Sequence, residues 1–353
     1  MTTVCIAASA SPWLAPMVQR LAAHDAVTLW APWANDGIAA QLPRRLQQLV
    51  PARIGGFLRR RQLPLMPAFN GRVVTDPRWL AVQGVMRMWT HNSRARELRA
   101  GLFERRMLAA WTCRRLQRSS AEATMLVATS LAAREPFALA KALGMRTVLF
   151  LDLPHLATLH ADLDRAAQRW PTDQYLRHFR APAWTIARQH AEFELADHII
   201  VRGPYAASSV ATRTRRRLTD IEVLPTPAIG PVIELATSPD APLLLAGPAA
   251  GRNGFTLAAD AAAQLGRTLL VRSSAATDPR HRAAPGVRWL DHDAPLPRTV
   301  AAIVAPAVCE AFLPCTPGAG LHVVGSDKVS GVTDVVDLTV DSLVNAVMSA
   351  LRQ

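Results

Sequence analysis

Short continuous apolar runs alternate along the chain with longer stretches whose apolar residues recur every three or four positions. The first run covers residues 2–8, and PWLAPMVQRLAAH follows it with helical spacing. Ser11 and Pro12 stand at the expected start of this helix, where both residue types are common. AVTLWAPW then predicts a second strand. This β-α-β order favours a parallel sheet that is covered on both faces.

The same alternation resumes after residue 120. Strands are predicted at TMLVATS, RTVLFLDL, HIIVRG and IEVLP, and helices at LAAREPFALAKALGM, at PYAASSVATRT and over a long tract from about 156 to 197. Residues 225–242 are dense in proline and lack periodicity, so we place a domain boundary there. The chain is therefore predicted to form one domain over residues 1–227, with a basic helical insert at 41–120, and a second domain over residues 228–353.

A second alternating pattern fills the C-terminal domain. It predicts strands at PLLLAG, RTLLVRSS, PGVRWLD, TVAAIVAP and LHVVGSD, and helices over FTLAADAAAQLG and the closing DSLVNAVMSALRQ. The expected fold class is α/β, with two Rossmann-like, doubly wound parallel-sheet domains that face an interdomain cleft. Half of the 353 residues are apolar and 19% are charged, which excludes a disordered or fibrous chain.

Several other classes of protein are disfavoured. The longest apolar stretches fall short of the ~18 residues that a membrane-spanning helix needs. The start MTTVCIAASASPW lacks the basic and apolar regions of a signal peptide. The four cysteines are irregularly placed, which argues against a disulfide framework or a zinc site. We expect a cytoplasmic protein that needs no metal and no cofactor.

Positive charge is concentrated in the insert at 41–120, which holds 17 arginines against three acidic residues in a chain of net charge +13. Such a segment attracts polyanions. Apolar residues are interleaved with the arginines, which favours an anionic membrane surface over a specific reader of nucleic acid. A solvated basic face is the alternative. The predicted membrane patch consists of Arg59, Arg60, Arg61, Arg105 and Arg106.

Residues that directly follow the predicted strands are the candidates for binding, because ligands of such sheets lie at the carboxyl ends of the strands. In the N-terminal domain these are Ser9 and Ser11, Asp152, and Arg202. His155 begins a predicted helix after the strand RTVLFL. Its imidazole could act in acid/base chemistry or bond a substrate hydroxyl, or it could simply cap the helix.

Glycines stand between a strand and a helix in LLLAGPAAGRNG, at the start of the C-terminal domain. Small residues there allow backbone N–H groups and a helix N-terminus to approach a phosphate, although this is not a Walker loop. Glu310 follows a later strand, where a carboxylate could accept hydrogen bonds from sugar hydroxyls or could be an ordinary surface residue. The candidate ligand-binding residues of this domain are Gly247, Gly251, Arg252, Asn253, Arg272 and Asp327.

Several segments together resemble the GT-B glycosyltransferases of the group-1, or GT4-like, type. AEFELADHIIVRGPYAASSV with IEVLPTP is similar to that family's helix-strand-helix block and interdomain segment, TVLFLDLPHL to its strand-and-histidine element, and APAVCEAF and GLHVVGSDKVSG to segments of its donor domain. The resemblance covers about residues 120–350. It implies a retaining sugar transfer from a nucleotide-sugar, with His155 at the reaction centre, Glu310 on sugar hydroxyls and the loop 247–254 on the diphosphate. The candidate residues of the C-terminal domain would then be donor-binding, and Ser9, Ser11, Asp152 and Arg202 would lie on the acceptor side.

Three positions depart from the family's pattern. Pro248 and Asn253 stand where its phosphate loop usually has an arginine and a lysine, which leaves Arg252 as a stand-in, and Gly318 or Cys315 stands where its second glutamate is expected. Our first hypothesis is a glycosyltransferase, peripheral to the inner face of the cell membrane, that extends a glycan or lipid-linked acceptor in bacterial surface polysaccharide synthesis. The alternative is a catalytically lapsed homologue that scaffolds or activates a partner transferase. Nonspecific nucleic-acid binding is the third possibility.

Overall fold

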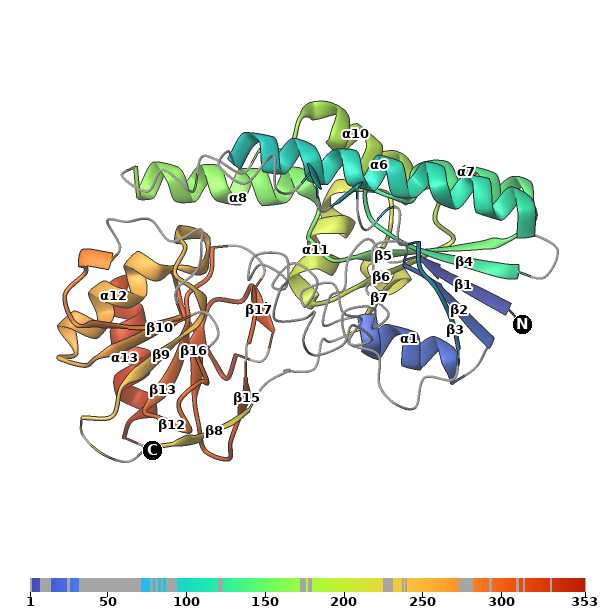
Figure 1. The fold of residues 1–353 in the computed structure, drawn as a ribbon. Helices are drawn as coiled ribbons and strands as arrows, with labels where there is room; N and C mark the ends of the chain where they lie inside the picture. The colour runs from blue at the N-terminus through green and yellow to red at the C-terminus, as the bar shows by residue number, and fades with distance from the viewer. Residues whose placement is uncertain are drawn as a thin grey trace. The chain divides into compact units, whose positions relative to one another are not determined.

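The residues that the computed structural model describes divide by their contacts into two compact units (Figure 1). Unit 1 comprises Met1–Leu153, Ala181–Arg202 and Thr214–Leu224, and unit 2 comprises Pro154–Arg180, Gly203–Arg213 and Pro225–Gln353. The described residues are 2–6, 14–23, 26–31, 71–76, 79, 82–83, 85–86, 94–119, 123–171, 176, 180–224, 231–236, 238, 240–272, 282–291, 294–308, 311–313, 315–330 and 332–352.

Unit 1 is built on a seven-stranded sheet with the order β3-β2-β1-β4-β5-β6-β7. All neighbouring strands are parallel. The order reverses direction between β1 and β4, which makes this pair the topological switch point where ligands of doubly wound sheets bind. The strands are β1 (Thr2–Ile6), β2 (Ala26–Trp30), β3 (Arg72–Val74), β4 (Ala123–Thr129), β5 (Arg146–Leu151), β6 (His198–Val201) and β7 (Ile221–Val223).

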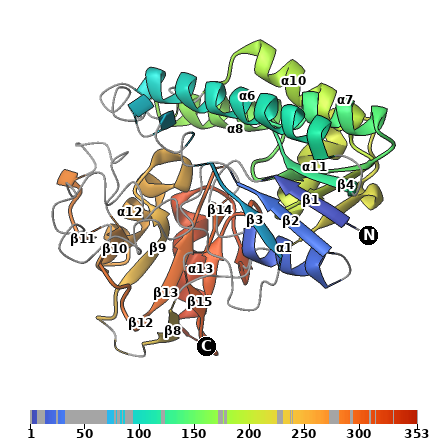
Figure 2. The same ribbon diagram turned by 45° about the vertical axis from the view of Figure 1, so that its right-hand side comes forward.

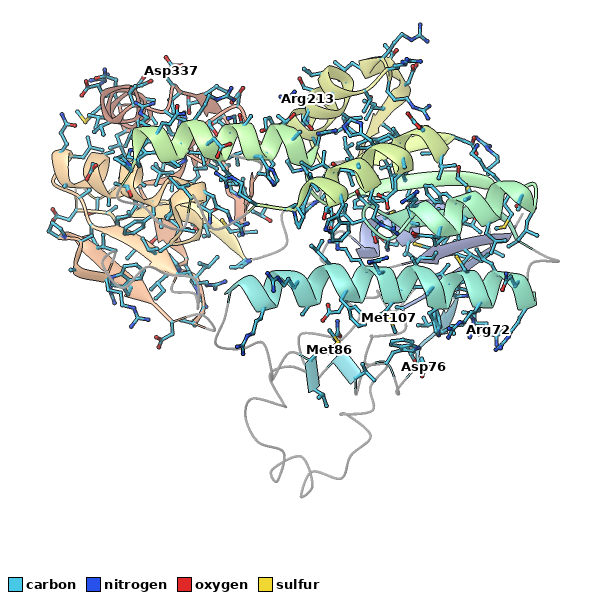
Figure 3. All side chains as sticks on the ribbon, turned by 90° about the horizontal axis from the view of Figure 1, so that it is seen from above. Arg72, Asp76, Met86, Met107, Arg213 and Asp337 are labelled. Carbon is cyan, nitrogen blue, oxygen red and sulfur yellow. The ribbon has the colours of Figure 1, made fainter. Side chains whose placement is uncertain are left out.

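Helices cover both faces of this sheet, as the apolar strands require. Helix α1 lies on one face and α7 and α10 lie on the other (Figures 1 and 2), because right-handed crossovers on the two sides of a switch point fall on opposite faces. Helix α6 packs against α7, and Arg72 and Asp76 lie beside its C-terminal half (Figure 3). These helices are α1 (Leu14–Ala22), α6 (Arg94–Ser119), α7 (Arg134–Ala142) and α10 (Ala183–Leu195).

The predicted helical tract from 156 to 197 is interrupted rather than continuous. Helix α8 spans Leu156–Arg169, and α10 begins after Pro182, which is its N-cap residue. Pro171 and Pro182 lie in the interruption. Proline lacks the N–H that a helix interior needs, so the apolar spacing continues through the tract while the helix does not. Helix α8 belongs to unit 2 and α10 to unit 1.

Unit 2 contains a parallel sheet of six strands in the order β11-β10-β9-β13-β16-β18. Leu243 and Leu245 of β9 pack with Phe255 of α12 and Leu343 of α13 on one face. The elements are β9 (Leu243–Pro248), β10 (Leu269–Arg272), β11 (Val287–Leu290), β13 (Ala302–Ala305), β16 (Val323–Gly325), β18 (Asp334–Val335), α12 (Phe255–Gln264) and α13 (Val340–Ala350), together with α11 (Pro204–Arg213).

Short strands cover the other face of this sheet. The strands β8 (Val232–Leu235), β12 (Thr299–Val300) and β15 (Thr316–Pro317) form a three-stranded sheet, and Ile233 and Val300 share a buried cluster with Leu244 and Ile303. The predicted boundary at 225–242 therefore contains a strand. The predicted strand TVAAIVAP is in fact two strands, β12 and β13, which belong to different sheets. The two separate parallel sheets confirm the predicted α/β class with two Rossmann-like modules.

Candidate functional site

The loop between β9 and α12 passes closely against the chain that follows β13. Gly247 and Gly254 have left-handed backbones, with φ of 103° and 73°. A Cβ added at Gly254 would lie 2.7 Å from the carbonyl carbon of Pro306 and closer still to its oxygen. Only glycine fits this combination of backbone and contact. Gly254 is also the N-cap of α12 and makes no side-chain capping bond, so no N-cap side chain covers this helix N-terminus, which is a favourable place for an anion.

The polar residues of this loop point in different directions. Gly251–Asn253 form a short 3-10 helix, η2. Arg252 is exposed, and its carbonyl accepts a 2.9 Å hydrogen bond from the N–H of Val308. Asn253 is buried and its amide packs beneath Gly247, 3.2 Å from where a Cβ of that glycine would lie. Arg252 and Asn253 are both predicted to bind a ligand, and Arg252 is the one of the two whose side chain is exposed to solution.

Arg272 ends β10 beside this loop, since the sheet register pairs it with Pro248. One terminal nitrogen of its guanidinium donates to the carbonyl of Ala294 at 2.7 Å. Its Nε is buried and has no hydrogen-bond partner among the described residues. A buried guanidinium N–H without an acceptor is costly, so Arg272 has capacity for an anion at the carboxyl edge of the sheet.

Lys328 is a candidate site residue that the sequence analysis did not identify. It follows the exposed Asp327 in the turn after β16, and its Nζ donates to the carbonyl of Val308 at 3.0 Å. Since the N–H of Val308 bonds the Arg252 carbonyl, Lys328 and the glycine loop are held by the same peptide. The cations Arg252, Arg272 and Lys328 thus belong to neighbouring segments at one edge of the unit 2 sheet. The chain has only one other lysine, Lys141. This rarity is the feature of the sequence that could have drawn attention to Lys328.

A buried carboxylate on α8 fixes the position of Lys328. Asp162 Oδ2 lies 3.4 Å from Lys328 Nζ and accepts a hydrogen bond from the Tyr205 hydroxyl of α11. The Lys328 ammonium also lies 5.5 Å from the centre of the Tyr205 ring. The Asp162 side chain is only 2% exposed and also pairs with Arg165. A buried charge needs such partners, so Asp162 acts as a positioning residue for Lys328.

His155 caps α8. The Nδ1 of its imidazole accepts a 3.1 Å hydrogen bond from the backbone N–H of Ala157. The backbone N–H of His155 donates to Ser209 Oγ of α11 at 2.9 Å. The side chain is fully buried. The capping role considered for this residue is therefore present. A role at the reaction centre, which the family resemblance implies, stays a prediction.

Two residues that the sequence analysis assigned to different surfaces form an ion pair in unit 1. Asp152 follows β5, and its Oδ2 lies 3.3 Å from a terminal nitrogen of Arg105 on α6. Arg105 also donates to the carbonyl of Ser130 after β4. The next residue, Arg106, is exposed and lies over the Trp184 ring at 5.8 Å. Arg105 thus faces the carboxyl edge of the sheet, whereas Arg106 faces solvent. Asp152 Oδ1 is buried without a hydrogen-bond partner in the described part of the chain.

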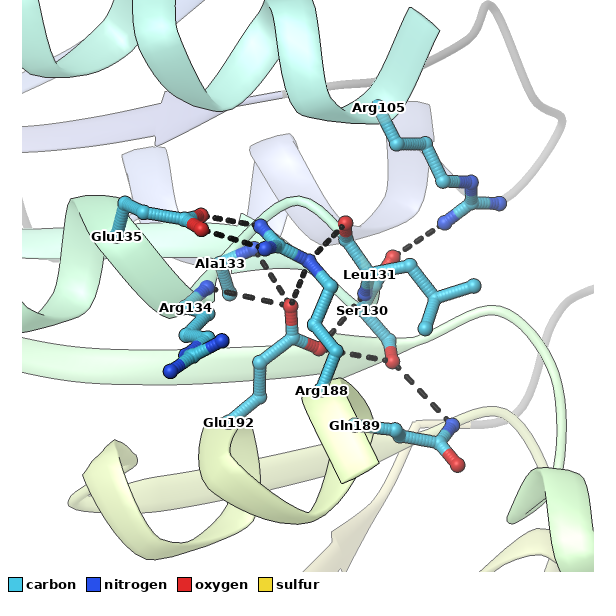
Figure 4. A network of polar contacts seen from close by, with 9 residues as sticks. All are labelled: Arg105, Ser130, Leu131, Ala133, Arg134, Glu135, Arg188, Gln189 and Glu192. Carbon is cyan, nitrogen blue, oxygen red and sulfur yellow. Dashed lines mark hydrogen bonds and ion pairs between the residues drawn. The ribbon is translucent and has the colours of Figure 1, made fainter. Parts of the chain in front are cut away.

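A buried glutamate on α10 organises the turn after β4 (Figure 4). Glu192 accepts hydrogen bonds from the backbone N–H groups of Leu131 at 2.7 Å, Ala133 at 3.0 Å and Arg134 at 3.2 Å. Burial raises the pKa of this carboxyl to about 7, against the opposing effect of these N–H groups and of Arg188. Glu192 lies in AEFELADHIIVRGPYAASSV, a segment that carries the family resemblance, but the sequence analysis assigned it no role.

Arg188 completes this network. Its terminal nitrogens form a two-pronged pair with the carboxylate of Glu135, and its Nε donates to the carbonyl of Leu131 at 3.0 Å. Leu131 has a left-handed backbone, with φ of 70°, which is strained for a residue with a side chain. The network holds this turn at the end of β4, next to β1, where the strand order reverses.

Several predicted residues lie outside the described part of the chain: Ser9, Ser11, Arg59, Arg60, Arg61 and Glu310. Arg202 is half-buried and follows β6 directly. Among the described residues, no three His, Cys, Asp or Glu side chains are grouped to hold a metal ion. Within the same residues, every helix is too short or too polar to cross a bilayer.

No protein-family model and no curated protein matches the sequence. Solved structures do resemble the fold. HepE from Anabaena, solved in complex with UDP, is similar with a TM-score of 0.52 and 11% identity over 100% of this chain and 90% of that chain. A trehalose-6-phosphate synthase, studied for glycosyl transfer with retention, is similar with a TM-score of 0.53 and 10% identity over 99% and 90%. The likeness shows the fold: the chain has the GT-B architecture, as predicted.

Proposed function

We propose that this protein is a glycosyltransferase that moves a sugar from a nucleotide-sugar donor to an acceptor. The observation that carries the proposal is the carboxyl edge of the unit 2 sheet. There the tight glycine loop and the uncapped start of α12 lie next to Arg272, and Val308 ties Lys328 to the same loop. The UDP complex of HepE and the glycosyl transfer named for trehalose-6-phosphate synthase support this assignment on the same fold.

The chemistry follows from charge. When the bond between the sugar and the diphosphate breaks, negative charge develops on the departing nucleotide. Guanidinium and ammonium groups and a helix N-terminus stabilise that charge without a metal ion. Arg252, Arg272 and Lys328 would supply this stabilisation, and Asp162 would keep Lys328 in place. His155 at the reaction centre and Glu310 on the sugar hydroxyls complete the proposed site, and retention of configuration is the expected outcome.

The two lysines of the chain provide a matched test. Lys328→Met removes the proposed phosphate contact, while Lys141→Met removes an exposed lysine that pairs with Asp197 at the surface of unit 1. Calorimetry with UDP and GDP should show binding by the unaltered protein and by Lys141→Met, and at least about tenfold weaker binding by Lys328→Met. Equal affinities of the three proteins for the nucleotide would remove Lys328 from the donor site.

The acceptor and the cellular setting are inferred from charge. We propose a glycan or lipid-linked acceptor in bacterial surface polysaccharide synthesis, with the arginine-rich insert at 41–120 in contact with the inner face of the cell membrane. Co-sedimentation with phosphatidylglycerol vesicles at low and high salt tests this contact against neutral phosphatidylcholine vesicles. Binding to both lipids alike, or none to either, would contradict it.

A non-catalytic scaffold or activator of a partner transferase is the second candidate. Asn253 motivates it, since this residue is buried beneath Gly247 instead of presenting a cation to a phosphate. The scaffold predicts that neither UDP nor GDP, nor their sugars, bind at millimolar concentration. Any nucleotide binding that Lys328→Met weakens would favour the transferase.

A further inference from the structure

Unit 1 has a cavity of about 600 Å³ beside the C-terminal half of α6. Three arginines of α6 line it, together with two tryptophans and one carboxylate: Arg114, Arg115, Arg118, Trp79, Trp111 and Asp76. The volume is in the range of cavities that hold one small ligand. None of these residues belongs to the proposed donor site, which lies in unit 2.

The positive charge of the cavity is built into the helix. Arg114 and Arg118 are four positions apart and share one face of α6, and Arg115 is three positions from Arg118 on the adjoining side, so the cavity is lined from two sides of one helix turn. Arg114 and Arg118 are exposed. The pKa of the Arg115 guanidinium is lowered, mainly by burial and in addition by the positive charge of Arg72 on β3. Asp76 opposes this effect and is the one carboxylate among the described residues of the lining. The described lining thus carries more positive than negative charges, and a bound anion would reduce the repulsion between the arginines.

The aromatic residues give the cavity a rigid wall. Arg115 lies over the rings of Trp30 and Trp111, at 5.5 and 5.4 Å from their centres, and the two indoles meet edge to face at 5.9 Å. Trp30 is buried at the end of β2. Arg115 is therefore held in a fixed orientation, and Trp79 and Trp111 bring flat, largely apolar ring surfaces to the lining.

We propose that this cavity binds an anionic sugar, namely a pyranose ring that carries a phosphate or a carboxylate group. Guanidinium groups bind both anions through paired N–H donors, and an indole face matches the apolar face of a sugar ring. A bare anion would use only the arginines, and a neutral sugar only the tryptophans. The inference concerns a second ligand site and holds whether or not the donor site in unit 2 binds a nucleotide.

The test measures binding of glucose 6-phosphate, glucuronate, glucose and inorganic phosphate to the full chain by calorimetry. We expect at least one of the two anionic sugars to bind about tenfold or more tightly than glucose and than inorganic phosphate. The double variant Arg114→Gln with Arg118→Gln should lose this binding by at least about tenfold. Arg99→Gln, an exposed arginine of the same helix outside the cavity, is the matched control and should bind as the unaltered protein does.

Two further arms make the result decisive. Trp79→Ala should weaken binding of the anionic sugar but leave that of inorganic phosphate unchanged. UDP binding should be the same in all these variants, which separates this site from the donor site. Equal binding of the sugars by the double variant and by Arg99→Gln would overturn the proposal. So would binding of phosphatidylglycerol vesicles through Arg114 and Arg118 without binding of any soluble anionic sugar, since that result identifies a membrane contact.

Discussion

The backbone N–H of Leu131 donates a 2.7 Å hydrogen bond to the carboxylate of Glu192, and Leu131 itself has a left-handed backbone with φ of 70°. A left-handed conformation costs about 1 to 2 kcal/mol for a residue with a side chain. Glu192 offsets this cost, because it accepts hydrogen bonds from Ala133 and Arg134 in the same turn. The turn after β4 is therefore specified by a residue from a different part of the chain.

Glu192→Ala should destabilise the protein strongly. The change leaves three backbone N–H groups without their acceptor and removes a carboxylate that lies 3.7 Å from Arg188 Nε, at a cost of about 3 to 5 kcal/mol in the free energy of unfolding. Urea denaturation at neutral pH measures this. Glu194→Ala is the matched control on the same helix, since Glu194 is exposed, and it should change the unfolding free energy by less than about 0.5 kcal/mol. Equal losses in the two variants would contradict the role assigned to Glu192.

The titration of Glu192 should be visible in stability. Its folded-state pKa is raised to about 7 from an ordinary 4.5 by burial. A raised pKa means that the folded state holds the proton more tightly, so the associated stability is present below about pH 4.5 and is lost as the pH rises through 7. Relative to Glu192→Gln, which does not titrate, the unaltered protein should lose stability on the order of 2 to 3 kcal/mol between pH 5 and pH 8. A difference that stays constant over this range would show that the carboxyl does not titrate there.

Gly254 and Gly266 offer a paired test of the donor loop. Both have left-handed backbones, with φ of 73° and 64°, but a Cβ at Gly266 meets nothing within 4 Å, whereas one at Gly254 overlaps the Pro306 carbonyl. Gly266→Ala should cost about 1 kcal/mol from the backbone alone. Gly254→Ala should cost at least about 2 kcal/mol more, since the loop must move. Thermal unfolding of both variants checks this, and comparable melting temperatures would show that the contact with Pro306 is not restrictive.

Two variants of His155 can distinguish its role as a helix cap from a role at the reaction centre. Asparagine is a good N-cap residue and alanine is not, so His155→Ala should destabilise by about 1 kcal/mol more than His155→Asn. If His155 also acts at the reaction centre, both variants should lose sugar transfer to a similar degree, because neither has an imidazole. Thermal unfolding and hydrolysis of a UDP-sugar measure the two properties separately. Full activity in His155→Asn would assign this histidine to capping alone.

The sequence by itself determined the two parallel sheets. Buried parallel strands have short continuous apolar sequences, and the helices that cover them have apolar residues on one side. Both patterns are local, so each can be recognised within a single segment of the sequence. Gly247 and Gly254 were also identifiable, because glycine between a strand and a helix indicates a tight loop. The prediction failed locally where two elements share one pattern: TVAAIVAP is uniformly apolar, yet Val300 and Ile303 belong to strands of different sheets.

The tertiary structure decided which polar residues meet. Arg105 and Arg106 are adjacent and chemically identical in sequence, yet one bonds Asp152 and the other faces solvent, since neighbouring residues on a helix point about 100° apart. Lys328 and Asp162 are far apart along the chain and meet only because α8 packs in the same unit as the turn after β16. Such pairs depend on long-range packing, for which the local alternation of apolar and polar residues carries no signal.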